Sequence, residues 1–351
     1  MIEIEKYDFN LPKELIAQKP VEPRDKARLM ILRKNKIHHK NFSQIIAEFQ
    51  NNDVIILNNS KVIPSKMFGR KETGGKVEFL FIRDVSKKLE KENTWLVMIK
   101  GHGIRPGGKL YLKSKETKIL GKIIKHIEGA KFLVTFFPHN NECISEIIRK
   151  NGIIALPPYI KRKYDDFKIY QTVYSKNEGS IAAPTAGLHF TNQLLSDLLK
   201  KGINVVYLTL HVSASSFVPI TEKTLVKSPL DPEYYKIPNQ TIKLYNEAVE
   251  NNWNICVVGT TTLKAIESAC NKEGYIEKSE EMSNLFISPG YKYRSKVSMF
   301  ITNFHTPRSP PLLMVSAFYD WEKLRYAYET AIRNRYRFFS FGDAMLIYKN
   351  R

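Results

Sequence analysis

Two patterns of apolar and polar residues alternate along the chain, and the change between them predicts two structural regions. In residues 1–63 and 151–351, short continuous apolar runs, such as 54–57, alternate with stretches in which apolar residues recur every three to four positions, such as 194–199. Continuous runs are typical of strands buried on both faces, and the three-to-four spacing is typical of amphipathic helices. Their alternation predicts an α/β domain.

The elements expected in this domain follow from the same pattern. The expected strands are residues 28–32, 53–60, 205–210, 255–259 and 314–318, and the expected helices are residues 42–49, 191–199, 242–249, 263–269 and 326–332.

Between residues 64 and 150 the pattern consists of short alternating segments separated by glycine turns, with a helix expected at 144–150. Five or six short strands with this spacing are typical of a small antiparallel barrel. The expected fold class is therefore mixed α/β, with a main domain formed by residues 1–63 and 151–351 and a small β-barrel of residues 64–150 inserted into it.

Composition narrows the class of protein. The 351 residues are 43% hydrophobic, and no apolar run approaches the roughly 18 residues that span a bilayer. The N-terminal residues are too acidic and polar for a signal peptide. We therefore expect a soluble, cytoplasmic protein, and a monomer. The three cysteines lack CxxC spacing and the eight histidines lack an HExxH motif, so neither a disulfide framework nor a metal site is expected.

The net charge of +20 favours a polyanionic partner, and nucleic acid is the natural candidate. Lysine outnumbers arginine, however, and Asn and Ile are abundant, which an AT-rich genome would produce without selection for binding. The basic residues at the start of the barrel could follow a phosphate backbone or could simply be solvated strand residues. They are Lys61, Lys66, Arg70, Lys71 and Lys76.

Several small residues, together with one histidine, His189, precede the helix expected at 191–199. Residues of this size let a ligand approach the backbone, and a helix start offers free N–H groups to an anion. His211 and His305 occupy similar positions at strand or turn edges. The three histidines are predicted to share one site, although each could equally belong to an ordinary turn.

Two further segments could bind ligands. Gly259, Thr260 and Thr261 lie between a strand and a helix, where hydroxyl and N–H groups suit a ribose or an amino acid carboxylate, and a simply capped helix is the alternative. Residues 336–345 interleave aromatic residues with Arg335 and Arg337, which suits base stacking, but a C-terminal strand with buried phenylalanines explains the same pattern.

Taken together, these segments resemble the S-adenosylmethionine:tRNA ribosyltransferase-isomerases of queuosine biosynthesis. The matching segments cover nearly the whole chain in the same order. They are residues 58–64, 156–160, 170–175, 182–190, 208–212, 259–261, 302–305, 316–318 and 336–345.

The resemblance implies an α/β fold with an inserted barrel and an unusual group transfer. The ribosyl part of S-adenosylmethionine would move to 7-aminomethyl-7-deazaguanine at the wobble position of tRNA, with release of adenine and methionine, leaving epoxyqueuosine. S-adenosylmethionine would be consumed as a substrate, so no cofactor and no metal are expected.

The resemblance also suggests roles. A base must remove a proton next to the sulfonium, and a histidine suits this step. His189 is the expected base, with His211, His305 and Glu267 as candidates for proton transfer or for holding the ribose. The residues expected to bind S-adenosylmethionine are Thr185, Gly187, Gly259, Thr260, Thr261 and Lys264. The residues expected to bind tRNA are Asn58, Asn59, Lys61, Lys66, Arg70, Lys71, Arg335 and Arg337.

Several positions depart from the family pattern. Ser213 and Ser215 replace glycines, which would be costly if the backbone there needs a positive φ. In residues 228–233 only Glu233 is retained, Lys264 replaces an arginine, and Ser288 replaces a tyrosine. These changes leave two alternatives open: a member that binds tRNA without turnover, and an enzyme that uses S-adenosylmethionine with another acceptor.

Overall fold

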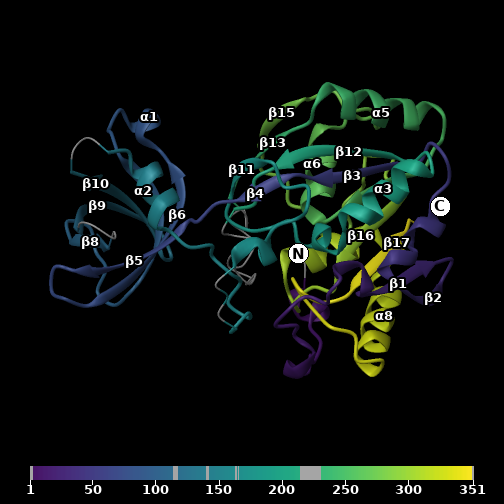
Figure 1. Cartoon of the computed structure of the whole chain (residues 1–351), viewed down its shortest axis with the longest axis horizontal. Coiled ribbons are helices and arrows are strands. Elements are labelled where there is room, and N and C mark those ends of the chain that lie inside the picture. Colours follow the sequence, from purple (N-terminus) through teal and green to yellow (C-terminus); the bar gives the residue numbers. More distant parts are fainter. Residues whose placement is uncertain are drawn as a thin grey trace. The chain divides into compact units, whose positions relative to one another are not determined.

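The computed structural model describes residues 3–113, 118–139, 142–162, 164, 166–213 and 231–349. The chain forms two compact units (Figure 1), one made of Met1–Lys61 and Pro157–Arg351 and the other of Val62–Leu156. The division into a main domain of residues 1–63 and 151–351 and an inserted barrel domain of residues 64–150 stays a prediction.

In the described part of the first unit, nine strands form one mixed sheet in the order β15-β13-β12-β3-β14-β16-β17-β1-β2. The four strands β12, β3, β14 and β16 are parallel to one another, and β3 and β12 run side by side in Figure 1. The bounds are β1 Arg28–Arg33, β2 Lys36–Asn41, β3 Val54–Asn58, β12 Asn204–Leu210, β13 Glu233–Lys236, β14 Ile255–Val258, β15 Glu280–Ser283, β16 Met299–Asn303 and β17 Ala344–Tyr348.

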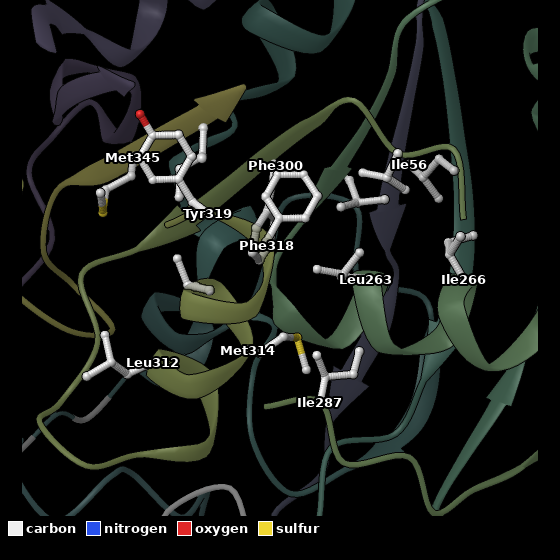
Figure 2. Packing of buried hydrophobic residues seen from close by; sticks show 14 of the residues in the cluster. Ile56, Leu263, Ile266, Ile287, Phe300, Leu312, Met314, Phe318, Tyr319 and Met345 are labelled. Atoms are coloured by element: carbon white, nitrogen blue, oxygen red, sulfur yellow. The ribbon is translucent and has the colours of Figure 1, made fainter. Parts of the chain in front are cut away.

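Successive side chains of each central strand point to opposite faces of this sheet, and both faces are buried because apolar residues of other elements pack on them. Ile56 of β3 packs with Phe300 on one face, together with apolar residues of α6 and α7 (Figure 2). Ile55 and Ile301 belong to the core of the other face, which α3 covers. The helices are α3 Asn192–Lys200, α5 Asn239–Glu250, α6 Thr260–Ala269, α7 Pro310–Phe318 and α8 Trp321–Arg333.

Local sequence explains two of these helices. Thr191 caps α3 as expected, since its hydroxyl accepts a hydrogen bond from the Leu194 amide at 3.1 Å. The strand expected at residues 314–318 is wrong, because these residues belong to helix α7. Ser309 caps that helix, and two prolines occupy its first turn, where a missing N–H costs nothing.

Shorter elements complete the first unit. Its 3₁₀ helices are η1 Ile4–Tyr7, η2 Lys13–Leu15, η3 Arg24–Lys26, η4 Phe42–Glu48, η5 Phe167–Tyr170 and η6 Thr185–His189. Strands β4, Ser60–Val62, and β11, Asn177–Ser180, form a small separate sheet.

The second unit contains a closed antiparallel barrel of six strands in its described residues, in the order β10-β7-β6-β5-β8-β9. Gly69 allows β5 and β8 to approach closely, since a Cβ atom there would lie 2.2 Å from the carbonyl oxygen of Tyr111. The mixed α/β fold class with a small barrel is therefore confirmed. The bounds are β5 Lys66–Lys71, β6 Lys76–Asp84, α1 Ser86–Leu89, β7 Thr94–Lys100, β8 Lys109–Lys113, β9 Lys118–Glu128, β10 Lys131–Phe137 and α2 Ile144–Asn151.

Candidate active site

A cavity of about 270 Å³ lies at the carboxyl ends of β14 and β16, in the first unit. This edge is where parallel sheets bind ligands. The lining comes from chain segments that are far apart in sequence. They are Pro158 and Tyr159, Tyr170, residues 182–186, Val212, residues 259–261, residues 302–307, Ser309, Pro311, Phe339 and Ser340.

The turn between β14 and α6 forms one wall of the cavity. Gly259 has φ of 88°, a conformation that L side chains rarely adopt, and it serves as the N-cap of α6 without a side-chain cap. The first N–H groups of the helix have no intrahelical partner. Thr261 is held in place because its hydroxyl accepts a hydrogen bond from Asn58 Nδ2 at 3.1 Å. This wall therefore offers hydroxyl and N–H groups to a ligand.

Asn303 connects the cavity to the buried ring of His189. Its Nδ2 donates to the Phe339 carbonyl and to His189 Nε2, both at 3.1 Å, and its Oδ1 accepts from the Thr185 hydroxyl at 3.4 Å. Because His189 Nε2 accepts this bond, its proton belongs on Nδ1 and the ring is neutral. Burial lowers the pKa of His189 to about 4, which agrees with the neutral form. His189 lies behind Asn303 and does not line the cavity.

His305 lines the cavity itself. Its Nε2 lies 2.7 Å from the Thr302 hydroxyl, and its backbone N–H donates to the Tyr328 hydroxyl at 2.9 Å. Desolvation lowers the pKa of His305, so the ring is a neutral imidazole at pH 7. A neutral, oriented imidazole at a cavity wall can accept a proton.

Two tyrosines of the cavity were not predicted as site residues. The Tyr159 hydroxyl lies 2.7 Å from Ser340 Oγ, and burial raises the pKa of Tyr159 to about 12. The Tyr170 hydroxyl is buried and has no hydrogen-bond partner among the described residues. Both belong to segments that resemble the family, residues 156–160 and 170–175, so their motifs carried a usable signal.

Comparisons with known proteins agree with this geometry. Residues 4–347 match the model of a family described as queuosine biosynthesis protein. The chain belongs to this family. It is 41% identical to an S-adenosylmethionine:tRNA ribosyltransferase-isomerase of Clostridium kluyveri, and the match covers 99% of this chain and 100% of the relative. It is 40% identical to a protein of the same name from Clostridioides difficile, and that match covers 97% of this chain and 98% of the relative. A crystal structure of an S-adenosylmethionine tRNA ribosyltransferase from Thermotoga maritima is 31% identical, covers 97% of this chain and 99% of its own, and gives a TM-score of 0.54.

Other expected site residues of this queuosine-family chain lie away from the cavity. His211 Nδ1 is 2.7 Å from the Ser60 hydroxyl, and a Cβ atom added at Gly179 would lie 2.8 Å from the His211 ring. Gly187 packs against Tyr174, whose hydroxyl would lie 1.9 Å from an added Cβ atom. Of the three histidines predicted to share one site, only His305 lines the cavity. The catalytic roles of His189 and His211 stay predictions.

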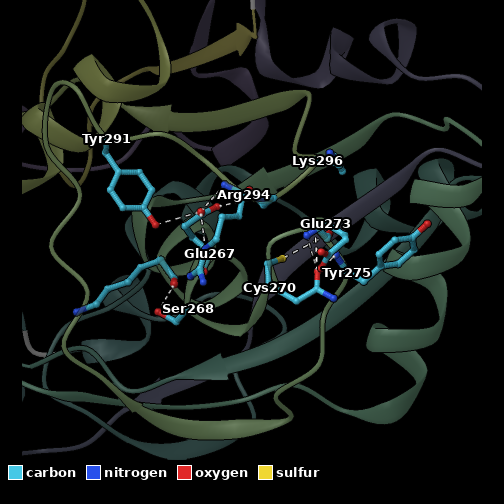
Figure 3. A network of polar contacts seen from close by, with 12 residues as sticks. Glu267, Ser268, Cys270, Glu273, Tyr275, Tyr291, Arg294 and Lys296 are labelled. Carbon is cyan, nitrogen blue, oxygen red and sulfur yellow. Dashed lines mark hydrogen bonds and ion pairs between the residues drawn. The ribbon is translucent and has the colours of Figure 1, made fainter.

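Glu267 is fully buried inside a separate polar network (Figure 3). One carboxylate oxygen accepts hydrogen bonds from the Arg294 amide at 2.6 Å and the Tyr291 hydroxyl at 3.1 Å, and the other accepts from the Ser295 amide at 3.1 Å. Glu267 does not line the cavity, and its contacts anchor residues 291–295 to α6. The structure therefore does not place it where proton transfer was expected.

Lys264 lines a smaller pocket that adjoins the cavity and shares Thr260, Thr261 and Pro311 with it. Its ammonium forms a buried ion pair with Glu233 at 3.0 Å. Glu233 also accepts a hydrogen bond from the Ser213 amide at 2.8 Å. Ser213 does not have a positive φ, so the backbone strain that a serine would have in that conformation does not arise at this position. Ser215 and residues 228–230 lie outside the described residues.

The two asparagines expected to contact tRNA are buried. Asn58 Oδ1 accepts hydrogen bonds from the amides of Ser60 and Leu210, and Asn59 Oδ1 accepts from the Thr209 hydroxyl at 2.7 Å. Their amides thus fix the end of β3 against β12. The structure does not support direct contact of either side chain with tRNA, because both are occupied inside the protein.

The cationic side chains expected to bind tRNA differ in exposure and in whether they form ion pairs. Arg70 and Arg335 are exposed, whereas Arg337 pairs with Asp343 at 3.0 Å, Lys61 with Glu178 at 3.1 Å and Lys66 with Glu78 at 2.8 Å. Arg70 and Lys71 border a hollow of about 640 Å³ on the barrel. We call this the barrel hollow; its other basic and aromatic residues are Lys76, Lys113, Lys118, Phe68 and Tyr111.

The described residues contain neither a membrane-spanning helix nor a cluster of metal-binding side chains. No helix there is long and apolar enough to cross a membrane. No group of three or more His, Cys, Asp or Glu side chains there is arranged to hold a metal ion.

Proposed function

We propose that this protein is an S-adenosylmethionine:tRNA ribosyltransferase-isomerase. It transfers and isomerises the ribosyl part of S-adenosylmethionine onto 7-aminomethyl-7-deazaguanine at the wobble position of tRNA, forming epoxyqueuosine and releasing adenine and methionine. The proposal includes a monomer that acts in the cytoplasm, consumes S-adenosylmethionine as a substrate and needs no metal or other cofactor.

One observation carries the proposal. Seven of the nine segments that resemble the family motifs contribute residues to a single cavity, although these residues are spread over positions 158–340. Family membership over nearly the whole chain supports the same reaction, since relatives at 40–41% identity bear this enzyme's name. A fold alone would not support a reaction, but convergence of these segments on one cavity does.

The cavity suits the chemistry in two respects. Its volume of about 270 Å³ is close to the lower end of the range for small-molecule sites, and its wall combines apolar groups with a few polar ones. The imidazole of His305, which lies at the cavity wall with its Nε2 2.7 Å from the Thr302 hydroxyl, is our candidate for the base that takes the proton next to the sulfonium. His189 would then act indirectly, by holding Asn303 at the cavity wall.

For tRNA, the net charge of +20 provides attraction, and the barrel hollow provides a basic surface with exposed aromatic area. Phe68, at its edge, is 49% exposed, which is unusual for phenylalanine and suits stacking on an unpaired base. We therefore propose the barrel hollow as one part of the tRNA contact surface.

The test is to incubate the purified protein with S-adenosylmethionine and tRNA carrying 7-aminomethyl-7-deazaguanine. Mass spectrometry then measures free adenine, free methionine and epoxyqueuosine in the digested tRNA. Appearance of all three is the expected result. Binding of tRNA without adenine would favour a member that no longer turns over, and adenine release without the modified tRNA would favour another acceptor.

A further inference from the structure

A small pocket beside the cavity contains a buried ammonium group, that of Lys264, which has one hydrogen-bond acceptor among the described residues. The pocket has a volume of about 40 Å³ and is lined by apolar side chains and by the Glu233–Lys264 ion pair. Its apolar walls are Phe286, Ile287, Pro310, Pro311 and Met314. Thr260 and Thr261 line both this pocket and the cavity.

Lys264 has more hydrogen-bond donors than acceptors around it. Its side chain is 3% exposed, and its ammonium carries three N–H donors, but among the described residues it has one acceptor, Glu233 Oε2. The other oxygen of Glu233 already accepts from the Ser213 amide. A buried ammonium with unused donors is costly unless another acceptor reaches it.

The start of α6 adds to the same positive region. Thr260 and Lys264 are four positions apart, so they are neighbours on one face of the helix, and both line the pocket. The first N–H groups of α6 lack intrahelical partners, and Gly259 supplies no side-chain cap.

We propose that this pocket binds the carboxylate at the methionyl end of S-adenosylmethionine, and that Lys264 determines the preference for a substrate bearing that carboxylate. The pocket is too small for the nucleoside part, which belongs in the larger cavity that it adjoins. The carboxylate supplies the acceptors that the Lys264 ammonium lacks. This inference rests on the proposed function, because it assigns one end of its substrate.

The experiment compares S-adenosylmethionine with decarboxylated S-adenosylmethionine, which differs only by the carboxylate and keeps the sulfonium. Calorimetry measures the affinity of each ligand for the wild type, for Glu233→Gln and for the double variant Lys264→Met/Glu233→Gln. The double variant avoids leaving Glu233 buried without its counter-charge. Thermal unfolding followed by circular dichroism verifies that each variant folds.

The wild type is expected to bind S-adenosylmethionine about 10- to 100-fold more tightly than the decarboxylated analogue, as for a hydrogen bond between charged groups. Glu233→Gln keeps this preference because Lys264 remains. The double variant loses it, and its affinity for the decarboxylated analogue stays close to that of the wild type.

Three outcomes would overturn the inference: a wild type without the preference, a double variant that retains it, or a double variant that loses affinity for both ligands by the same factor. A wild type that releases adenine normally but shows no preference overturns this inference alone. A wild type that binds neither ligand overturns the proposed function as well.

Discussion

At the scale of single residues, the neutral ring of His189 has a consequence for stability. The unfolded chain takes up a proton at this histidine near pH 6.5, whereas the folded chain takes it up only near pH 4. Between these values the unfolded state binds more protons, so the free energy of unfolding falls as the pH decreases. From this group alone we expect a loss of about 2 kcal/mol between pH 7 and pH 5.

Denaturant unfolding at the two pH values measures this loss, and His189→Gln is the matched control. The glutamine oxygen can accept the hydrogen bond from Asn303 Nδ2, but it has no titration in this range. The variant is expected to lose about 2 kcal/mol less than the wild type over the same interval. Equal losses in both proteins would show that His189 does not titrate as its contacts indicate.

The position of His305 at the cavity leads to a second prediction. His305→Gln should lower the rate of adenine release by about 10²- to 10⁴-fold, the usual contribution of a positioned proton acceptor. His211→Gln should lower the rate much less, because His211 contacts Ser60 and Gly179 outside the cavity. Single-turnover measurements with saturating S-adenosylmethionine compare the two variants. A larger loss in the His211 variant would reverse the assignment.

Residue types in the sequence predicted that a polar site exists. They predicted less well which side chains line that site. Asn58 and Glu267 have the chemistry of binding residues, but each is occupied by backbone partners inside the fold. Glu267 lies four positions after Leu263 on a helix buried on most sides, so helical periodicity could have placed it in the core. No pattern in the sequence could show that Asn58 bonds to Leu210, because that contact depends on how β12 pairs with β3.

At the scale of elements, continuous apolar runs predicted four strands of the sheet, β1, β3, β12 and β14, and short alternating segments with glycine turns predicted the barrel, because both are local signals. The other five strands of the sheet, β2, β13, β15, β16 and β17, were not predicted. The pattern misread residues 314–318, where an apolar run of helix α7 looks the same as a buried strand. The signal that separates the two is Ser309 followed by two prolines, a helix start. The position and full lining of the cavity could not be predicted from the sequence, because its walls come from loops that only the order of the strands in the sheet brings together.

The barrel hollow gives a prediction at this scale. The double variant Arg70→Glu/Lys76→Glu should weaken tRNA binding and reduce the slope of log affinity against log salt by about 1 or more, because contacts with phosphates release counterions. Lys87→Glu/Lys88→Glu, which changes two exposed lysines of α1 that do not border the hollow, is the control with the same change in net charge, and it should change both quantities less. Binding is measured by filter retention at several salt concentrations. Equal effects of the two variants would indicate general charge attraction instead of a specific surface.

At the scale of the whole molecule, the two units have separate hydrophobic cores. The barrel core is built from residues such as Phe79, Val97 and Val134, and the cores of the first unit contain none of them. The cavity and the small pocket are lined only by residues of the first unit.

S-adenosylmethionine should therefore slow hydrogen exchange in one unit only. At a ligand concentration 100 times the Kd, binding adds about 2.7 kcal/mol to the stability of the state that binds it, so the slowest amides should exchange about 100-fold more slowly. These amides are expected in β3, β14 and β16, which the ligand-binding unit buries fully. Amides of β6 and β7 should keep their rates, because the barrel can open without opening the cavity. Hydrogen exchange followed by mass spectrometry measures the rates in both units. Equal slowing in both units would mean that the chain unfolds as one cooperative body. Slowing in neither unit would mean that S-adenosylmethionine does not bind.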